Sequence, residues 1–200
     1  MTGKTHLCFG IGVSFLALRP ETLGACFGVL AGAAIGGVIA DIDMPASAGK
    51  GEGYIISAAA MMTTAAAFAA DAATGKNLIH EILNGADVIR FLGLALFLGL
   101  GLAGALTAHR SFMHSLLGWA LFTGAVYLAA PPLTGAFGVA YGSHLALDMF
   151  NKKGMPLLFP MKRRFSLKLF RADGIADKLL LGLSLPGAAA LIVTALIRSA

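Results

Sequence analysis

The chain has 200 residues, of which 58% are hydrophobic and only 12% are charged, and its mean hydropathy is +0.82. Soluble domains carry about 25% charged residues, so this composition excludes a soluble domain and predicts an integral membrane protein. The formal net charge is +5. In a membrane protein such a charge is typical of basic loops rather than of a nucleic-acid surface, so the expected partner is the lipid bilayer and no nucleic acid is expected.

Apolar segments follow one another along the chain. The first, residues 7–18, is short for a crossing, which needs about 20 apolar residues, and it is predicted to be tilted, snorkelled at its ends or re-entrant. Further segments are expected at residues 23–40, 54–70, 88–108, 116–130, 133–150 and 178–197. The predicted fold class is therefore an all-α integral membrane protein, a multi-pass bundle of about six or seven transmembrane segments that forms a single domain over residues 1–200.

Two stretches have a recognisable pattern of packing or surface residues. Glycine recurs at every fourth position of the second segment, at Gly24, Gly28, Gly32 and Gly36. This row predicts a helix face without side chains, which another helix can approach closely. Residues 151–177 are predicted to form a basic interfacial loop, because their Lys and Arg residues alternate with Phe and Leu as in segments that lie on anionic headgroups.

Imidazoles and carboxylates occur where the apolar segments begin or end. His144 and Asp148 are four residues apart, so they share one face of a helix, and ionisable groups at membrane depth are costly and usually functional. Counting crossings from His6 returns all the other groups to the same membrane face. The predicted cluster comprises His6, Asp41, Asp43, His109, His114, His144 and Asp148.

The distribution of basic residues predicts the orientation of this cluster. Eleven of the 15 Lys and Arg residues fall on the cluster's side of the membrane, and four fall on the other: Arg19, Lys76, Arg90 and Arg198. Positively charged loops stay in the cytoplasm. The cluster is therefore expected to face the cytoplasm.

Four histidines and three aspartates are more donors than one tetrahedral zinc ion needs. Imidazole and carboxylate suit zinc, manganese or iron, so we expect one or two divalent ions, with zinc as the first choice. A pair of metal ions stabilises the attacking and leaving oxygens of a phosphoryl displacement. Arg110 is predicted either to clamp an anionic group or only to anchor a helix end, and Asp43 is a candidate both for metal binding and for the catalytic base.

Two other kinds of function use the same residues. A transporter or channel would pass a divalent cation or a proton, but it should place ionisable groups at more than one depth. A non-catalytic membrane protein would use the metal as a clip between helix ends. The gathering of the groups at one face favours a hydrolase.

Four blocks of the chain resemble the YdjM-like, LexA-regulated, membrane-bound metal-dependent hydrolase family: Thr5-His6; Asp41-Ile42-Asp43-Met44-Pro45; His109 to Ser115; and Gly142-Ser143-His144 to Asp148. The family usually has His, Gly and Thr at the positions of Met44, Ser111 and Met113. The resemblance implies a multi-pass protein of the bacterial inner membrane with metal-dependent hydrolase activity. A more distant similarity to zinc-dependent phospholipase C and P1-type nucleases implies cleavage of a phosphoester, including a phospholipid reached from the bilayer.

Overall fold

The structure is a computed structural model that describes residues 1–43, 87–106, 111–161 and 163–199. The described residues form six α-helices and no β-strand: α1 (Gly3–Leu18), α2 (Leu23–Val38), α5 (Asp87–Ala105), α6 (Leu116–Ala129), α7 (Thr134–Met149) and α8 (Ile175–Ser199). Three short 3-10 helices connect or extend them: η1 (Ile39–Asp43), η3 (Phe112–His114) and η4 (Pro131–Leu133). The predicted all-α class is confirmed, and the segment expected at 54–70 lies outside the described residues.

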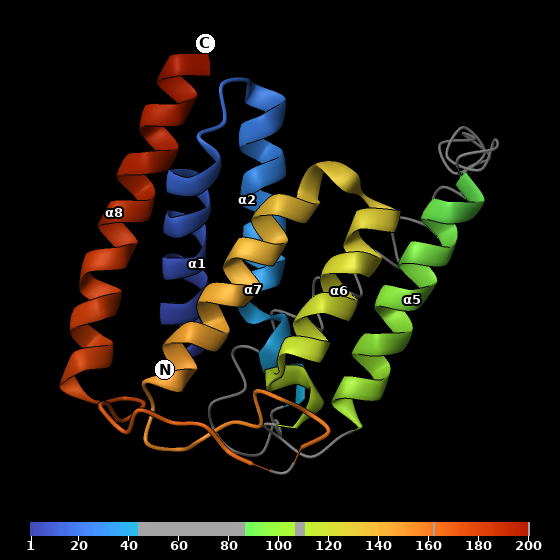
Figure 1. Ribbon diagram of the computed structural model, residues 1–200. Helices are drawn as coiled ribbons and strands as arrows, with labels where there is room; N and C mark the ends of the chain where they lie inside the picture. The colour runs from blue at the N-terminus through green and yellow to red at the C-terminus, as the bar shows by residue number, and fades with distance from the viewer. Residues whose placement is uncertain (44–86, 107–110, 162, 200) are drawn as a thin grey trace.

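The helices lie roughly side by side (Figure 1), and the neighbouring pairs α1 with α8 and α2 with α7 are parallel, whereas α1 is antiparallel to α2 and α7. α7 packs against both α1 and α2, α6 lies between α7 and α5, and α8 covers the other side of α1. The lower end is the end of the bundle at which α1, α6 and α8 begin and at which α2, α5 and α7 finish. The opposite end is called the upper end. α1 lies beside α2 and is shorter than α8.

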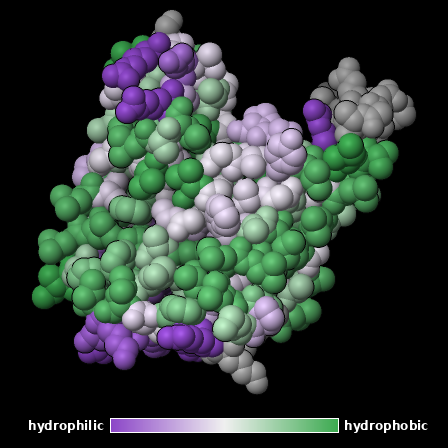
Figure 2. Space-filling model, in the orientation of Figure 1, coloured by the Kyte–Doolittle hydropathy of each residue, from purple (hydrophilic) through white to green (hydrophobic). Residues whose placement is uncertain are grey.

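The outer surface of the bundle is apolar. Three described segments are long and apolar enough to cross a membrane, namely Leu23–Asp43, Val88–Ala105 and Ile175–Ser199, while α1 and α6 are apolar but shorter. Figure 2 shows a broad hydrophobic belt with hydrophilic residues at both ends of the molecule. The chain is thus a helical membrane protein. The number of six or seven crossings stays a prediction.

The glycine row of α2 lies against α7 in its second half. A Cβ atom added at Gly32 would lie 2.6 Å from the carbonyl oxygen of Leu133, and one added at Gly36 would overlap the carbonyl oxygen of Phe137. The predicted packing role is confirmed at these two positions, because only hydrogen fits where the two backbones meet. Gly24, in the first turn, faces no atom within 4 Å.

Replacing Gly36 with alanine should destabilise the bundle, because the added methyl group collides with the backbone of α7. Overpacking of this kind costs about 1–3 kcal/mol, which corresponds to a fall in Tm of roughly 3–10 °C, measured by thermal unfolding in detergent. Gly24→Ala is the matched control, since its methyl group meets nothing and alanine favours a helix over glycine. Equal losses in both variants would contradict the close contact of α2 with α7.

Candidate metal centre

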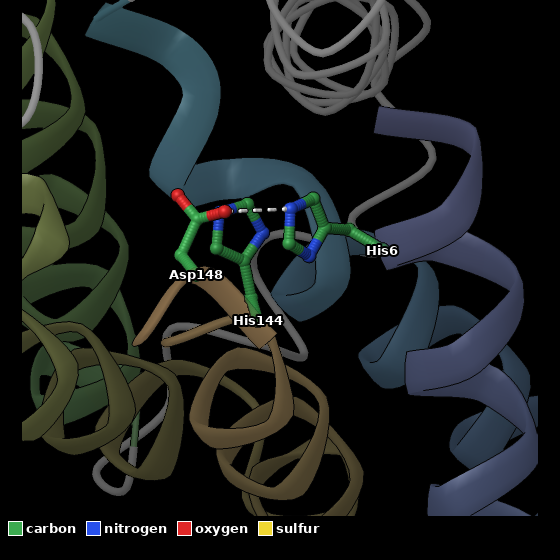
Figure 3. A group of neighbouring side chains, drawn as sticks. All are labelled: His6, His144 and Asp148. Atoms are coloured by element: carbon green, nitrogen blue, oxygen red, sulfur yellow. Dashed lines mark ion pairs between the residues drawn. The ribbon is translucent and has the colours of Figure 1, made fainter. Parts of the chain in front are cut away.

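The first turns of α1 and the last turns of α7 bring three ionisable side chains together at the lower end. His6 Nε2 lies 3.3 Å from Asp148 Oδ1, and the imidazole of His6 stacks on that of His144 with ring centroids 3.7 Å apart and planes inclined by 16°. Figure 3 shows His6 reaching from α1 toward the two α7 residues. As predicted, the spacing of four puts His144 and Asp148 on the same face of α7, directed at one point.

The two 3-10 helices η1 and η3 supply the rest of the cluster. His114, at the end of η3, has its Nε2 3.6 Å from Asp41 Oδ1 and 3.5 Å from Asp148 Oδ2. Its other nitrogen, Nδ1, lies 3.7 Å from Asp43 Oδ2. His114 is therefore surrounded by three carboxylates, two from η1 and one from α7.

Local hydrogen bonds explain why the chain turns His114 inward. The hydroxyl of Ser115 accepts a hydrogen bond from the backbone N–H of Gly118 at 3.0 Å, which caps the start of α6, and donates one to the carbonyl of Phe112 at 2.6 Å. From α7, the hydroxyl of Tyr141 donates a hydrogen bond to the carbonyl of Met113 at 2.6 Å. The residue before His114 is thus fixed to α7, and the residue after it begins α6.

The members of the cluster that the structure describes are shielded from solvent. His6, His114 and His144 are at most 1% exposed, and Asp41, Asp43 and Asp148 are at most 6% exposed. Burying a carboxylate is costly unless positive charge or hydrogen-bond donors lie beside it. Burial alone lowers the pKa of His114, but the carboxylates of Asp41 and Asp43 outweigh this effect and raise the pKa to about 9. The carboxylates thus strongly favour a positive charge on or beside His114.

Two buried imidazole nitrogens of the cluster are available as ligand atoms. Among the described residues, His6 Nδ1 and His144 Nε2 have no hydrogen-bond partner, although a buried polar atom without one costs about 1–3 kcal/mol. His144 Nδ1 lies 2.8 Å from the carbonyl oxygen of Gly37. Because a carbonyl can only accept, Nδ1 must donate, and the lone pair is left on Nε2. Histidines that bind metals are oriented in this way by their second nitrogen.

The donor atoms fall into two overlapping groups of three: His6, His144 and Asp148, and Asp41, His114 and His144. In each group the ligand atoms lie within 4.8 Å of one another. Buried imidazole and carboxylate donors at this spacing fit a divalent cation. The residues present are therefore chemically suited to the metal that the sequence predicts.

The structure brings together five of the seven predicted ligands in these two groups. Asp43 belongs to neither group and lies beside the second nitrogen of His114. His109 and Arg110 lie outside the described residues. The role of all these side chains in metal binding and catalysis stays a prediction.

Sequence reasoning missed a further buried carboxylate, Asp177, in the first turn of α8. Its Oδ1 accepts a hydrogen bond of 2.6 Å from the hydroxyl of Thr5, and its Oδ2 accepts bonds from the backbone N–H groups of Thr2 at 3.1 Å and Asp173 at 2.9 Å. Asp177 therefore fixes the start of α8 to the turn of α1 that carries His6. The sequence offers no strong signal for this contact, because an acidic residue at the start of a helix usually serves only the helix dipole.

A second missed contact involves the start of the chain. The amino group of Met1 lies 3.0 Å from Asp148 Oδ1, the same oxygen that faces His6. Together with the hydrogen bonds to Asp177, this contact holds the beginning of α1 against α7 and α8.

Fold and site together define an integral helical membrane protein with a buried cluster of imidazoles and carboxylates at one end of its bundle. A family model agrees with this class. The chain belongs to the YdjM inner membrane protein family, whose model matches residues 1–199, so the family resemblance seen in the sequence motifs is confirmed. Comparison with curated proteins and with solved structures gave no match.

Replacing Asp177 with alanine should loosen the first turns of α1 and weaken metal binding through His6. Loss of a partner outside the ligand shell typically lowers metal affinity 10–100-fold, and we expect at least a tenfold loss in titrations of the detergent-solubilised protein with Zn²⁺ or Mn²⁺. Asp177→Asn keeps one carbonyl oxygen as an acceptor and should lose less. Glu21→Ala, which removes an exposed carboxylate at the upper end, is the control, and a loss of the same size there would refute a specific role for Asp177.

Proposed function

We propose that the chain is a metal-dependent hydrolase that cleaves a phosphoester at the cytoplasmic face of the inner membrane. The observation that carries the proposal is the pair of overlapping donor groups, buried together and joined through His144. A buried set of this size is expensive to maintain without a cation. Its position at a single end of the bundle also distinguishes it from a conduction path.

His144 limits how the donors can be shared. Its Nδ1 is bonded to Gly37, so only Nε2 remains, and one nitrogen serves one ion. Asp148 has no such limit, because Oδ1 faces His6 and Oδ2 faces His114. One ion would use the His144 nitrogen, and a second would rely on Asp41 and His114, with Asp148 linking the two halves of the cluster.

A bound divalent cation, for which zinc is our first choice, would supply the Lewis acidity that lowers the pKa of water toward about 7. The chain's own residues hold and orient the components of the reaction. Asp43, which lies 3.7 Å from His114 Nδ1, would orient that imidazole, and its role as general base stays a prediction. Arg110 is proposed to hold the anionic group of the substrate.

Charge on the described residues supports the proposed orientation. The loop between α7 and α8 lies across the lower end (Figure 1) and exposes six cations: Lys152, Lys153, Arg163, Arg164, Lys168 and Arg171. Positive loops stay in the cytoplasm, so the cluster would face the cell interior. In the full chain, six or seven crossings are proposed, with residues 151–177 lying on anionic headgroups.

An apolar groove beside the cluster supports a lipid substrate. It has a volume of about 240 Å³ and lies between α6 and α7, lined in part by Leu116, Leu145, Ala146 and Met149. Leu145 and Met149 directly follow His144 and Asp148 in the chain, and Leu116 lies two residues after His114. An acyl chain in this groove would therefore keep its headgroup at the level of the cluster.

The length of α1 agrees with access from the bilayer. Its 16 residues span about 24 Å, less than the roughly 30 Å of the hydrocarbon core. His6, in the first turns of this helix, would then lie at the edge of the hydrocarbon layer, where the phosphate of a phospholipid is within reach.

Metal content and hydrolysis test the proposal together. We expect the protein purified in detergent to hold one or two divalent ions per chain and to cleave a member of a panel of phosphodiesters and phospholipids. His144→Ala and Asp148→Ala should retain less than about a tenth of the metal and of the turnover. The control is Ser143→Ala, because among the described residues the hydroxyl of Ser143 bonds only to its own helix, at the carbonyl of Ala140.

Two outcomes of that experiment would contradict the hydrolase proposal and favour another function. Stoichiometric metal without turnover of any phosphoester would favour a structural clip. Metal-dependent ion flux into liposomes, abolished by the same substitutions, would favour a transporter.

Filling the groove tests the lipid substrate separately. Ala146→Phe places a bulky ring in the apolar groove, and we expect KM for a phospholipid to rise about tenfold while KM for a small water-soluble phosphodiester stays unchanged. The matched control is Ala103→Phe, the same change at an exposed position of α5. Equal effects of Ala146→Phe on both kinds of substrate would rule out the groove as the acyl-chain site.

A further inference from the structure

A second cavity lies at the upper end of the bundle, between the last turns of α1 and α8. Its volume is about 530 Å³, within the range of roughly 300–1,000 Å³ that is usual for ligand sites. Arg19, on its rim, directly follows α1 and lies 13 positions after His6, which corresponds to about 20 Å of helix. The cavity is therefore separate from the candidate metal centre and takes no part in the proposed hydrolysis.

The cavity has an apolar wall and a charged rim. Phe15 and Leu16 of α1 and Leu191 and Ala195 of α8 form most of the wall, and the rim consists of Arg19, Glu21 and Arg198. In Figure 2 hydrophilic residues gather at this end, directly above the hydrophobic belt. An amphipathic molecule, with an anionic group joined to a hydrocarbon chain, matches both surfaces.

The two arginines are available for an external anion. Among the described residues, neither guanidinium has a hydrogen bond or an ion pair, and both side chains are exposed. Glu21 makes no ion pair with either of them, and it lies just before the N-terminus of α2, where the helix dipole stabilises a carboxylate. Guanidinium groups bind phosphate oxygens through two parallel N–H bonds, so two of them on one rim favour a phosphate.

We propose that this cavity binds an anionic phospholipid of the leaflet at the upper end. The phosphate would lie between Arg19 and Arg198, and the first part of an acyl chain would lie on the apolar wall. Free phosphate would use only the rim and leave the wall uncovered. Val193 and Ile197 of α8 are also strongly exposed apolar residues, so lipid chains already surround this part of the helix in a membrane.

Such a lipid would join the ends of two helices that are distant in sequence. Binding to the folded state alone stabilises that state, so the predicted consequence is a thermal stability that depends on the lipid headgroup. The test is to reconstitute the full chain in nanodiscs of phosphatidylcholine, with and without phosphatidylglycerol, and to measure Tm. Lipid retention is followed in parallel by native mass spectrometry of the wild type in an equimolar mixture of the two lipids.

We expect phosphatidylglycerol to raise the Tm of the wild type by several degrees and to be retained at least fivefold over phosphatidylcholine. Arg19→Gln/Arg198→Gln should lose both effects, whereas Arg90→Gln, a neutralised arginine at the start of α5, should keep them. If the double variant does not fold, the single variant Arg198→Gln and the retention ratio of the wild type decide the question.

Three results would overturn the proposal. The first is equal retention of the two lipids by the wild type. The second is an undiminished preference for phosphatidylglycerol in the arginine variants. The third is a Tm shift of the same size when inorganic phosphate is added to nanodiscs of pure phosphatidylcholine, which would assign the rim to a free anion. None of these results depends on metal content or turnover, so the lipid site is tested independently of the proposed hydrolase activity.

Discussion

Asp148 is the contact on which the lower end of the bundle depends. Its two oxygens face imidazoles from two separate parts of the chain, His6 at 3.3 Å and His114 at 3.5 Å, and its own helix adds His144. In an apolar bundle a carboxylate of this kind is tolerated only because positive or protonatable groups surround it. Four elements have to meet here, namely α1, η1, η3 and α7. If one of them were displaced, a desolvated charge would be left uncompensated.

The supporting structure around these contacts combines main-chain contacts with one further buried carboxylate, Asp177. Glycines of α2 allow α7 to approach within main-chain contact, and Tyr141 fixes η3 to α7 through the carbonyl of Met113. Asp177 fixes the start of α1 to α8. Helices are stiff over these lengths, so a few main-chain contacts at their ends hold the imidazoles in place. The cluster is thus held in place by contacts within the protein itself.

The convergence of the six described members of the cluster could be predicted from the sequence because it follows from two simple regularities. Apolar segments that alternate in direction return every second segment end to the same face, and the spacing of four between His144 and Asp148 selects one side of a helix. The glycine row likewise specified a close helix contact, though not that α7 would be the partner. Contacts between side chains and the backbone could not be predicted from the sequence. Nothing in the residue type of Gly37 marks its carbonyl as a partner of His144, and Asp177 looks like an ordinary first-turn acid until α1 is placed beside it.

The bond from His144 to Gly37 makes the chemical state of that imidazole a property of helix spacing. Because its acceptor is a main-chain carbonyl, no exchange of side chain at position 37 can delete it; only a shift of α2 relative to α7 can. Substitutions anywhere along the contact between α2 and α7, including ones far from any ionisable residue, would then affect the proton on Nδ1 of His144. The position of the proton on this buried imidazole therefore depends on the glycines that let α2 approach α7.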